Sequence, residues 1–158
     1  SPVSIEKRET AGNLHDKLAV LGARSLEKHV VPYIEGRLPL IEQDHEQATY
    51  CKKIRNVDAR IDWHASADKI DRLVRAMNPS PGAFTTCNDH QIKIFDVEIS
   101  QDDFTAPPGT VTEVGTHLVV SSGTGPLRIL SLQLSGKKKI TGEEFIHGFR
   151  NVPPSAFV

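Results

Sequence analysis

Two apolar stretches in the second half of this chain change phase partway along, and this feature limits the possible folds most. The run 91–99 is apolar at even positions until Phe95, where it switches to odd positions. The run 127–134 is apolar at odd positions and switches to even positions at Leu130. A β-bulge produces such a shift, and bulges help a sheet bend towards a barrel.

Further β-type segments surround these two runs. The stretches 110–114 and 117–121 are short, and Pro107-Pro108-Gly109 and the Gly-rich stretch 122–126 supply turns. Four or five short strands at this spacing predict a mainly β fold, a small Greek-key barrel. Thr141-x-x-Glu144 then predicts a capping box for a final short helix that holds Phe145, Ile146 and Phe149.

Helical periodicity is found upstream of the strands. We predict one helix capped by Thr10 and closed by Gly22, and a second over 24–34 that Pro32 kinks or ends early. From residue 37 to 50 the periodicity is lost, which indicates an extended connection. A further helix begins after Ser66 and stops at Asn78-Pro79, and its apolar stripe consists of Ile70, Leu73, Val74 and Met77.

Composition excludes several classes of protein. A net charge of −1 gives no general attraction to polyanions, so any nucleic-acid contact must come from local basic clusters. Two distant cysteines provide no disulfide framework, and the seven histidines show no metal-ligand spacing. No apolar run reaches membrane-spanning length. The chain starts on Ser1 rather than Met, which is consistent with a fragment or a processed product.

A series of short motifs carries a resemblance to a known family. These are Thr10-Ala-Gly-Asn-Leu-His-Asp-Lys-Leu18, Ala59-Arg-Ile-Asp-Trp63, Ile70-Asp-Arg-Leu-Val-Arg-Ala76, Pro79-Ser-Pro-Gly-Ala-Phe84, and Leu132-Gln-Leu-Ser-Gly-Lys-Lys-Lys139 with Glu144-Phe145. In this order they resemble the methionyl-tRNA formyltransferase family across almost the whole chain. The resemblance implies terminal helices of a missing catalytic domain at 1–36, an interdomain linker at 37–60, and an open, OB-like C-terminal barrel at 61–158.

The resemblance also implies what the parent protein does. Enzymes of this family transfer a formyl group from 10-formyltetrahydrofolate to the amine of initiator methionyl-tRNA, in bacterial or organellar translation initiation. Their catalytic Asn, His and Asp lie in the catalytic domain, so we expect this chain alone to be inactive and to bind neither cofactor nor metal. Asn88-Asp89-His90 imitates part of the catalytic spacing, but Gln-Ile-Lys-Ile follows it, and we predict a turn there.

What remains for this chain is binding. The candidate tRNA-binding residues are Lys52, Lys53, Arg55 and Arg60 in the linker, Lys137, Lys138 and Lys139 after the last strand, and Arg72 and Arg75 between these clusters. Basic side chains along a groove hold a phosphate backbone without reading sequence. The alternative for each is a solvated surface charge.

Two other functions stay open. The first is the C-terminal barrel of a sugar-nucleotide or folate formyltransferase, against which Gln133-x-x-Gly136-Lys-Lys favours the tRNA enzyme. The second is a free-standing interaction module. We expect the parent enzyme to be monomeric. In this chain, however, Leu14, Leu18, Leu21 and Leu26 should either fold back on the barrel or pair with a second molecule.

Overall fold

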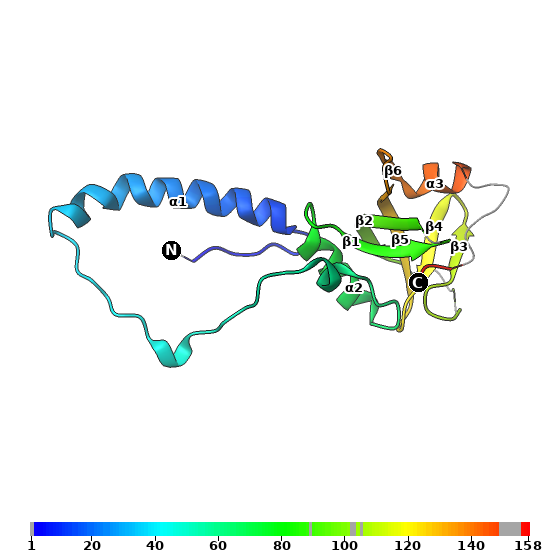
Figure 1. The fold of residues 1–158 in the computed structure, drawn as a ribbon, viewed down its shortest axis with the longest axis horizontal. Helices are drawn as coiled ribbons and strands as arrows, with labels where there is room; N and C mark the ends of the chain where they lie inside the picture. The colour runs from blue at the N-terminus through cyan, green and yellow to red at the C-terminus, as the bar shows by residue number, and fades with distance from the viewer. Residues whose placement is uncertain (1, 89, 102–103, 105, 149–155) are drawn as a thin grey trace.

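A bent antiparallel sheet forms one end of the molecule, and a long helix projects away from it (Figure 1). The computed structural model describes residues 2–88, 90–101, 104, 106–148 and 156–158. The strands are β1 (Ala83–Cys87), β2 (His90–Ile99), β3 (Val111–Val114), β4 (His117–Ser121), β5 (Pro126–Leu134) and β6 (Lys139–Thr141). Their order is β1-β2-β5-β4-β3, with β6 paired to β5. Because β3, β4 and β5 are successive neighbours and β2 returns beside β5, the predicted Greek-key arrangement is confirmed.

Both predicted phase shifts are bulges in the ladder between β2 and β5. Phe95 on β2 and Leu130 on β5 have no partner in this ladder, and each is an extra residue on its own strand. The pairs around them are Ile94 with Leu132, Asp96 with Ser131, and Val97 with Ile129. One extra residue on each strand offsets the other, so the register beyond the bulges is the same as before them.

The core is centred on three aromatic rings. The Trp63 ring centroid lies 5.9 Å from that of Phe157, which lies 6.4 Å from that of Phe145. Trp63 is 4% exposed, and its indole Nε1 donates a hydrogen bond of 3.0 Å to Thr85 Oγ1, which is fully buried. Trp63 is therefore a buried anchor of the core.

Residues 156–158, here called the closing segment, join the two edges of the sheet. The Val158 and Thr86 amides each donate to the other's carbonyl at 2.9 Å, which attaches the segment to β1. The Phe157 amide donates to the Gly109 carbonyl at 2.8 Å, and Thr110 forms a bridge with Ala156, just before β3. The sheet is thus closed by three residues that lie far from both edges in sequence.

Two short helices pack on the sheet, and both predicted caps are present. In α2 (Ala67–Met77) the Ser66 side chain accepts from the Lys69 amide at 3.3 Å. Before α3 (Gly142–Gly148) the Thr141 hydroxyl accepts from the Glu144 amide at 3.1 Å, and the Glu144 carboxylate accepts from the Thr141 amide at 2.8 Å. The predicted contribution of Phe149 to this helix lies outside the described residues.

The two predicted N-terminal helices are one. α1 runs without interruption over Ala11–Ile34, so the prediction that Gly22 closes a helix was wrong. An interior glycine costs only about 1 kcal/mol, too little to stop a helix. The helix ends instead at Ile34, and Gly36 follows its cap residue Glu35. Gly36 has a φ of +69° and its amide donates to the Tyr33 carbonyl, while the Arg37 amide donates to the Pro32 carbonyl. This pair of bonds is a Schellman motif.

Among the described residues, the first turn is the part of α1 that bonds to the sheet domain. The Gly12 amide donates to the Asn78 carbonyl at 3.0 Å, and a Cβ at Gly12 would lie 2.7 Å from Pro79 Cδ. The Arg8 guanidinium donates to Asp71 at 2.8 Å and to Asp96 at 2.7 Å, which fixes the segment before the helix.

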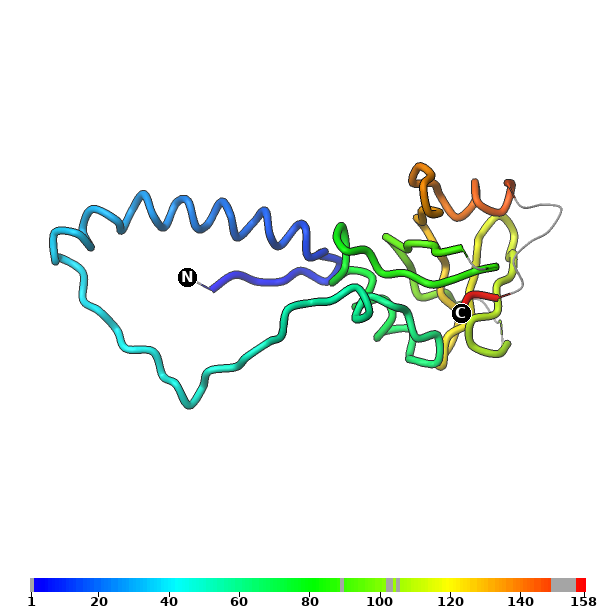
Figure 2. Tube along the Cα trace, viewed as in Figure 1, coloured from blue at the N-terminus to red at the C-terminus, as the bar shows by residue number. Residues whose placement is uncertain are grey.

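The rest of α1 projects away from the sheet domain, and Lys17 on it donates to the carbonyl of Ser4, in the segment before the helix, at 2.9 Å. Leu18 is 46% and Leu26 is 66% exposed, so the first of the two alternatives, folding back on the barrel, is not found for these two leucines, and pairing with a second molecule stays a prediction. Figure 2 shows residues 35–55 returning from the far end of α1 as a long open loop, interrupted by the short 3-10 helix His45–Gln47. No helix among the described residues is both long and apolar enough to cross a bilayer.

The number of strands also differs from the expectation. We predicted four or five strands with 127–134 as the last, but a sixth, β6, follows it and begins at Lys139. Three residues are too few to give a period-two pattern, so the sequence carried no signal for this strand.

Replacing Trp63 with Ala should lower the free energy of unfolding by about 3–5 kcal/mol, because it leaves a cavity and a buried hydroxyl without its donor. The measurement is chemical denaturation followed by circular dichroism, since Trp63 is the only tryptophan. Tyr50→Ala, at a side chain 92% exposed, is the matched control and should change nothing. Equal stability of the two variants would mean that Trp63 does not anchor the core.

The exposed face of α1 should make the chain self-associate, because large apolar patches in water tend to find cover. Sedimentation velocity over a wide range of protein concentration should show a rising average mass. The double variant Leu18→Lys, Leu26→Lys should remain monomeric. A wild-type chain that is monomeric at every concentration would contradict this prediction.

Candidate nucleic-acid interface

A row of outward-facing side chains crosses the sheet from one edge to the other. Residues paired across a ladder lie on the same face of the sheet. The successive partners start in the segment 60–63, here called the entering segment, and continue through β1, β2 and β5 to β6. They are Arg60, Phe84, Lys93, Gln133 and Lys139. With about 4.8 Å between neighbouring strands, this row spans roughly 19 Å. We call these five residues the cationic row.

Intramolecular contacts fix three of the five members of the cationic row. Lys93 Nζ donates to the Pro81 carbonyl at 2.7 Å. Lys139 Nζ lies 4.4 Å from the centroid of the Phe95 ring, which is a cation–π contact. The Gln133 amide nitrogen donates to the Lys137 carbonyl at 2.8 Å and so holds the turn before β6. The charges are therefore displayed from a rigid sheet rather than from a mobile loop.

The predicted lysine triplet lies at one end of this row. Lys137 and Lys138 are exposed in the turn between β5 and β6, where Gly136 has a φ of +71°. Lys139 is the first residue of β6, which corrects its expected position in a loop. The three lysines therefore form an end of the sheet surface.

The linker cations lie beyond the other end. Lys52 and Lys53 are exposed in an extended stretch that precedes the 3-10 helix Asn56–Ala59. Arg55 donates to Asp58 at 3.1 Å, and this hydrogen bond lowers the pKa of the Asp58 carboxyl and raises that of the Arg55 guanidinium. Arg55 is thus partly neutralised within the chain, whereas Lys52 and Lys53 have no side-chain bond among the described residues.

The two arginines of α2 have different environments. Arg75 donates to Asp71 at 3.0 Å and to the Glu9 carbonyl at 3.3 Å, so it belongs to the attachment of α1. Arg72 is exposed and, together with Arg60, lines a recess beside α2. Of the two, Arg72 is the one placed to extend the cationic row.

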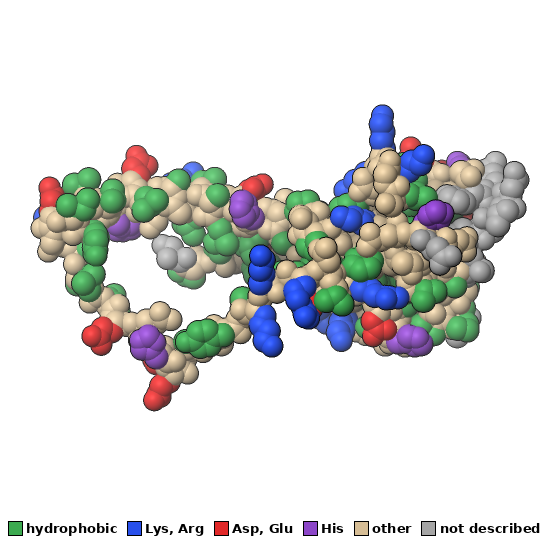
Figure 3. Space-filling model, viewed as in Figure 1, with side chains coloured by type: hydrophobic (Ala, Val, Ile, Leu, Met, Phe, Trp, Pro, Cys, Tyr) green, Lys and Arg blue, Asp and Glu red, His purple; other side chains and the backbone are tan. Residues whose placement is uncertain are grey.

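The space-filling view shows how these charges are distributed. Lys and Arg side chains gather where the chain enters the sheet domain and near β6, whereas α1 and the long loop show mainly apolar and acidic side chains (Figure 3). A chain with a net charge of −1 therefore still presents a basic surface over the sheet.

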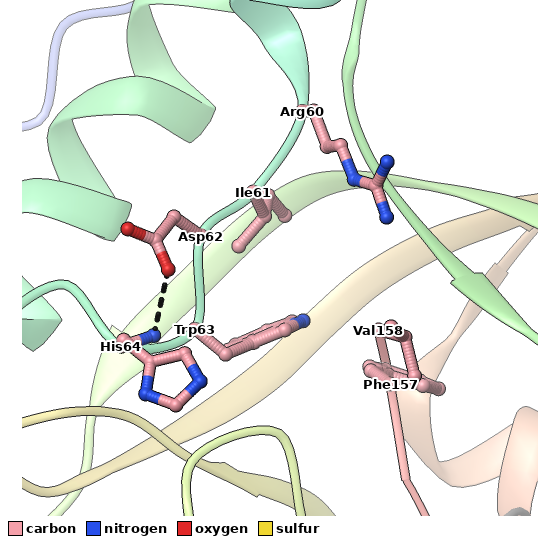
Figure 4. A pocket seen from close by; sticks show the side chains of 7 residues that line it. All are labelled: Arg60, Ile61, Asp62, Trp63, His64, Phe157 and Val158. Atoms are coloured by element: carbon pink, nitrogen blue, oxygen red, sulfur yellow. Dashed lines mark hydrogen bonds between the residues drawn. The ribbon is translucent and has the colours of Figure 1, made fainter.

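A separate recess of about 310 Å³ lies beside Trp63 (Figure 4). Trp63, Phe157 and Arg60 are among the residues that line it. The Asp62 carboxylate accepts from the His64 amide at 3.0 Å. Among the described residues no group of His, Cys, Asp or Glu side chains could hold a metal ion.

The motif Asn88–His90 lies at the hairpin between β1 and β2. Cys87 pairs with His90 across this hairpin, and Asn88 has a φ of +47°, which is common for Asn in a tight turn. Asp89 lies outside the described residues. Asn88 and His90, which resembled part of a catalytic set, are therefore exposed at a turn.

Sequence reasoning missed Lys93, Phe84 and Gln133 as parts of a common surface. Ile92 and Ile94 enclose Lys93 in strict alternation, which was a readable signal that Lys93 points outward. The order of strands that brings it beside Lys139 had no such signal.

Comparison with known proteins is consistent with this architecture. Residues 53–150 match the sequence model of the family described as "Formyl transferase, C-terminal domain". The chain is 38% identical over 154 residues to the methionyl-tRNA formyltransferase of Bacillus velezensis, covering 96% of this chain and 48% of that protein. It is 33% identical over 152 residues to that of Staphylococcus aureus, covering 95% of this chain and 49% of that protein. The chain thus spans about half the length of these curated relatives.

Solved structures share the fold at low sequence identity. A variant of HypX from Aquifex aeolicus superposes with a TM-score of 0.67 at 12% identity, over 90% of this chain and 27% of that one. HypX in complex with tetrahydrofolic acid gives a TM-score of 0.60 at 14% identity, over 78% and 22%.

Proposed function

Because the chain belongs to the formyl transferase C-terminal domain family, we propose that it is the tRNA-binding part of a methionyl-tRNA formyltransferase. The whole enzyme would transfer a formyl group from 10-formyltetrahydrofolate to the amine of initiator methionyl-tRNA, in a bacterial cytoplasm or an organelle. The observation that carries the proposal is the cationic row, which is displayed on a rigid sheet in a chain without net positive charge. Cations arranged in this way bind a phosphate backbone independently of sequence.

We assign the roles of the cations according to whether an acidic side chain of the chain already pairs with them. Lys137, Lys138 and Lys139 at one end, and Lys52 and Lys53 at the other, would hold the RNA backbone. Arg60 and Arg72 would extend this contact around the edge of β1. Arg55 and Arg75 are engaged with Asp58 and Asp71, so we propose that they mainly position their neighbours.

The proposal places folate chemistry outside this chain. Asn88 and His90 lie at an exposed hairpin, and this geometry does not fit a site that encloses a folate and an amine. The domain boundaries at 36 and 60 stay a prediction, although Ala59 is fully buried and the Arg60 bridge already joins the sheet.

The C-terminal barrel of a sugar-nucleotide or folate formyltransferase is the second candidate, because the resemblance implies that such relatives share the elements Ile61-Asp62-Trp63 and Pro79-x-Pro81-Gly-Ala-Phe84. It has no need of a basic surface that crosses four strands. Binding of a sugar nucleotide with no binding of tRNA would favour it.

Replacing Lys137, Lys138 and Lys139 with Ala should weaken tRNA binding and reduce its salt dependence. Each lost phosphate contact should flatten the slope of log affinity against log salt by roughly 0.7–0.9. The measurement is a titration with initiator tRNA at several salt concentrations, where the wild type should bind with about micromolar or weaker affinity. Arg24→Ala with Lys28→Ala on α1 is the charge control. Equal slopes for the wild type and the lysine variant would mean that the triplet is only solvated surface.

The isolated chain should not formylate methionyl-tRNA. The sequence lacks the catalytic Asn and His followed by a Pro-Ser-Leu-Leu-Pro loop. The assay is formyl transfer from 10-formyltetrahydrofolate at high protein concentration. Turnover that survives repurification of the chain would contradict the proposal that formyl transfer takes place outside this chain.

A further inference from the structure

A small polar recess opens at the Arg60 end of the cationic row. It has a volume of about 280 Å³, and the side chains that give it its chemistry are Asn56, Ser80, Phe84, Gln91 and Lys93. Three chain segments meet here: the 3-10 helix Asn56–Ala59, the stretch 80–82, and the hairpin of β1 and β2. Phe84 and Lys93 belong to both the recess and the row, so any strand held along the row passes over its mouth.

The walls of this recess are held in place by contacts of their own. The Asn78 side-chain Nδ2 donates to the Phe95 carbonyl at 2.7 Å, and the Gly82 backbone amide donates to the Met77 carbonyl at 2.9 Å. These bonds tie the stretch before β1 to β2 and to α2. Gly82 has a φ of +84°, and a Cβ there would lie 3.1 Å from Lys93 Cδ. Glycine therefore leaves the space through which the Lys93 side chain reaches Pro81.

The side chains around the recess suit one part of a nucleic acid. Phe84 packs on the core with part of its ring and lines the recess with the rest, so it is a fixed stacking surface. Asn56 and Gln91 each carry an amide with both donors and an acceptor, which can pair with the edge of a base. The Lys93 ammonium uses one N–H on Pro81 and keeps two for a phosphate.

The size and the chemistry together exclude a paired helix as the occupant. Sites for whole small molecules usually measure about 300–1,000 Å³, so this recess accommodates a group no larger than a nucleotide. Bases in a duplex have their faces stacked and their edges paired, whereas an unpaired base offers both to a protein.

We propose that this recess takes one unpaired nucleotide of the bound RNA, with its base stacked on Phe84 and its phosphate on Lys93. The inference rests on the proposed function and makes it more specific. The sheet would then recognise an RNA that has an unpaired nucleotide near a duplex, rather than any polyanion.

The test compares two RNAs and two variants. Phe84→Leu retains an apolar group for the core but removes the ring face, and it should weaken binding of initiator tRNA by about five- to fiftyfold, as expected for the loss of one stacked base. Binding of a plain RNA duplex of similar length should not change. Tyr33→Leu, at an exposed aromatic residue on α1, is the matched control and should leave both affinities unchanged.

A fluorescent base reports stacking directly. A single-stranded RNA hexamer with one 2-aminopurine should lose fluorescence on binding the wild type and keep it with Phe84→Leu. If Phe84→Leu does not fold, the double variant Asn56→Ala, Gln91→Ala replaces it, because both side chains are exposed. It should reduce the preference for tRNA over duplex.

The outcomes separate the two proposals. If tRNA does not bind the wild type even at low salt, the proposed function fails and this inference fails with it. If tRNA binds but the folded variants keep the wild-type preference for tRNA over duplex, only the unpaired-nucleotide site is overturned. Free adenosine monophosphate that binds as tightly as the hexamer would also overturn it, since the recess would then be a mononucleotide site.

Discussion

The hydrogen bond from the Trp63 indole to the buried Thr85 hydroxyl is the interaction on which the other parts of the sheet domain depend. Thr85 in turn donates to the Val158 carbonyl at 3.0 Å, and the Trp63 ring packs on Phe157. The entering segment 60–63, β1 and the closing segment are therefore joined at Thr85. A buried hydroxyl without partners would be costly, so the three segments are held together or lost together.

This junction also determines where the charges lie. Arg60 pairs with Phe84 three residues before the buried Trp63, and that bridge places Arg60 at the start of the cationic row. The remaining positions of the row follow from the ladders of β1, β2, β5 and β6. The basic surface over the sheet is thus a direct result of how the strands are paired, although the composition of the chain as a whole gives no such signal.

Local patterns in the sequence predicted the helix caps and the β-bulges, because these features depend on residues close together in the chain. The caps at Thr10, Ser66 and Thr141, and the shifts at Phe95 and Leu130, are all visible within a few positions of the chain, and the structure has each of them.

Features that depend on distant residues were not predictable in this way. The pairing of Val158 with Thr86 and the alignment of Lys93 with Lys139 are decided by strands that are far apart in sequence. The same holds for the candidate site, since the lysine triplet stood out as a run of like charges whereas Lys93 is a single charge within an apolar strand. Gly22 illustrates the opposite error, in which a local signal was too weak to end a helix.

The matched bulges at Phe95 and Leu130 constrain how such a sheet can change during evolution. Loss of either residue alone would slip half of the central ladder by one position, which turns every following side chain to the opposite face. Loss of both together would restore the pairing with a flatter sheet. Insertions and deletions in these two strands are therefore expected to arise as compensating pairs, even though 35 positions separate Phe95 from Leu130 along the chain.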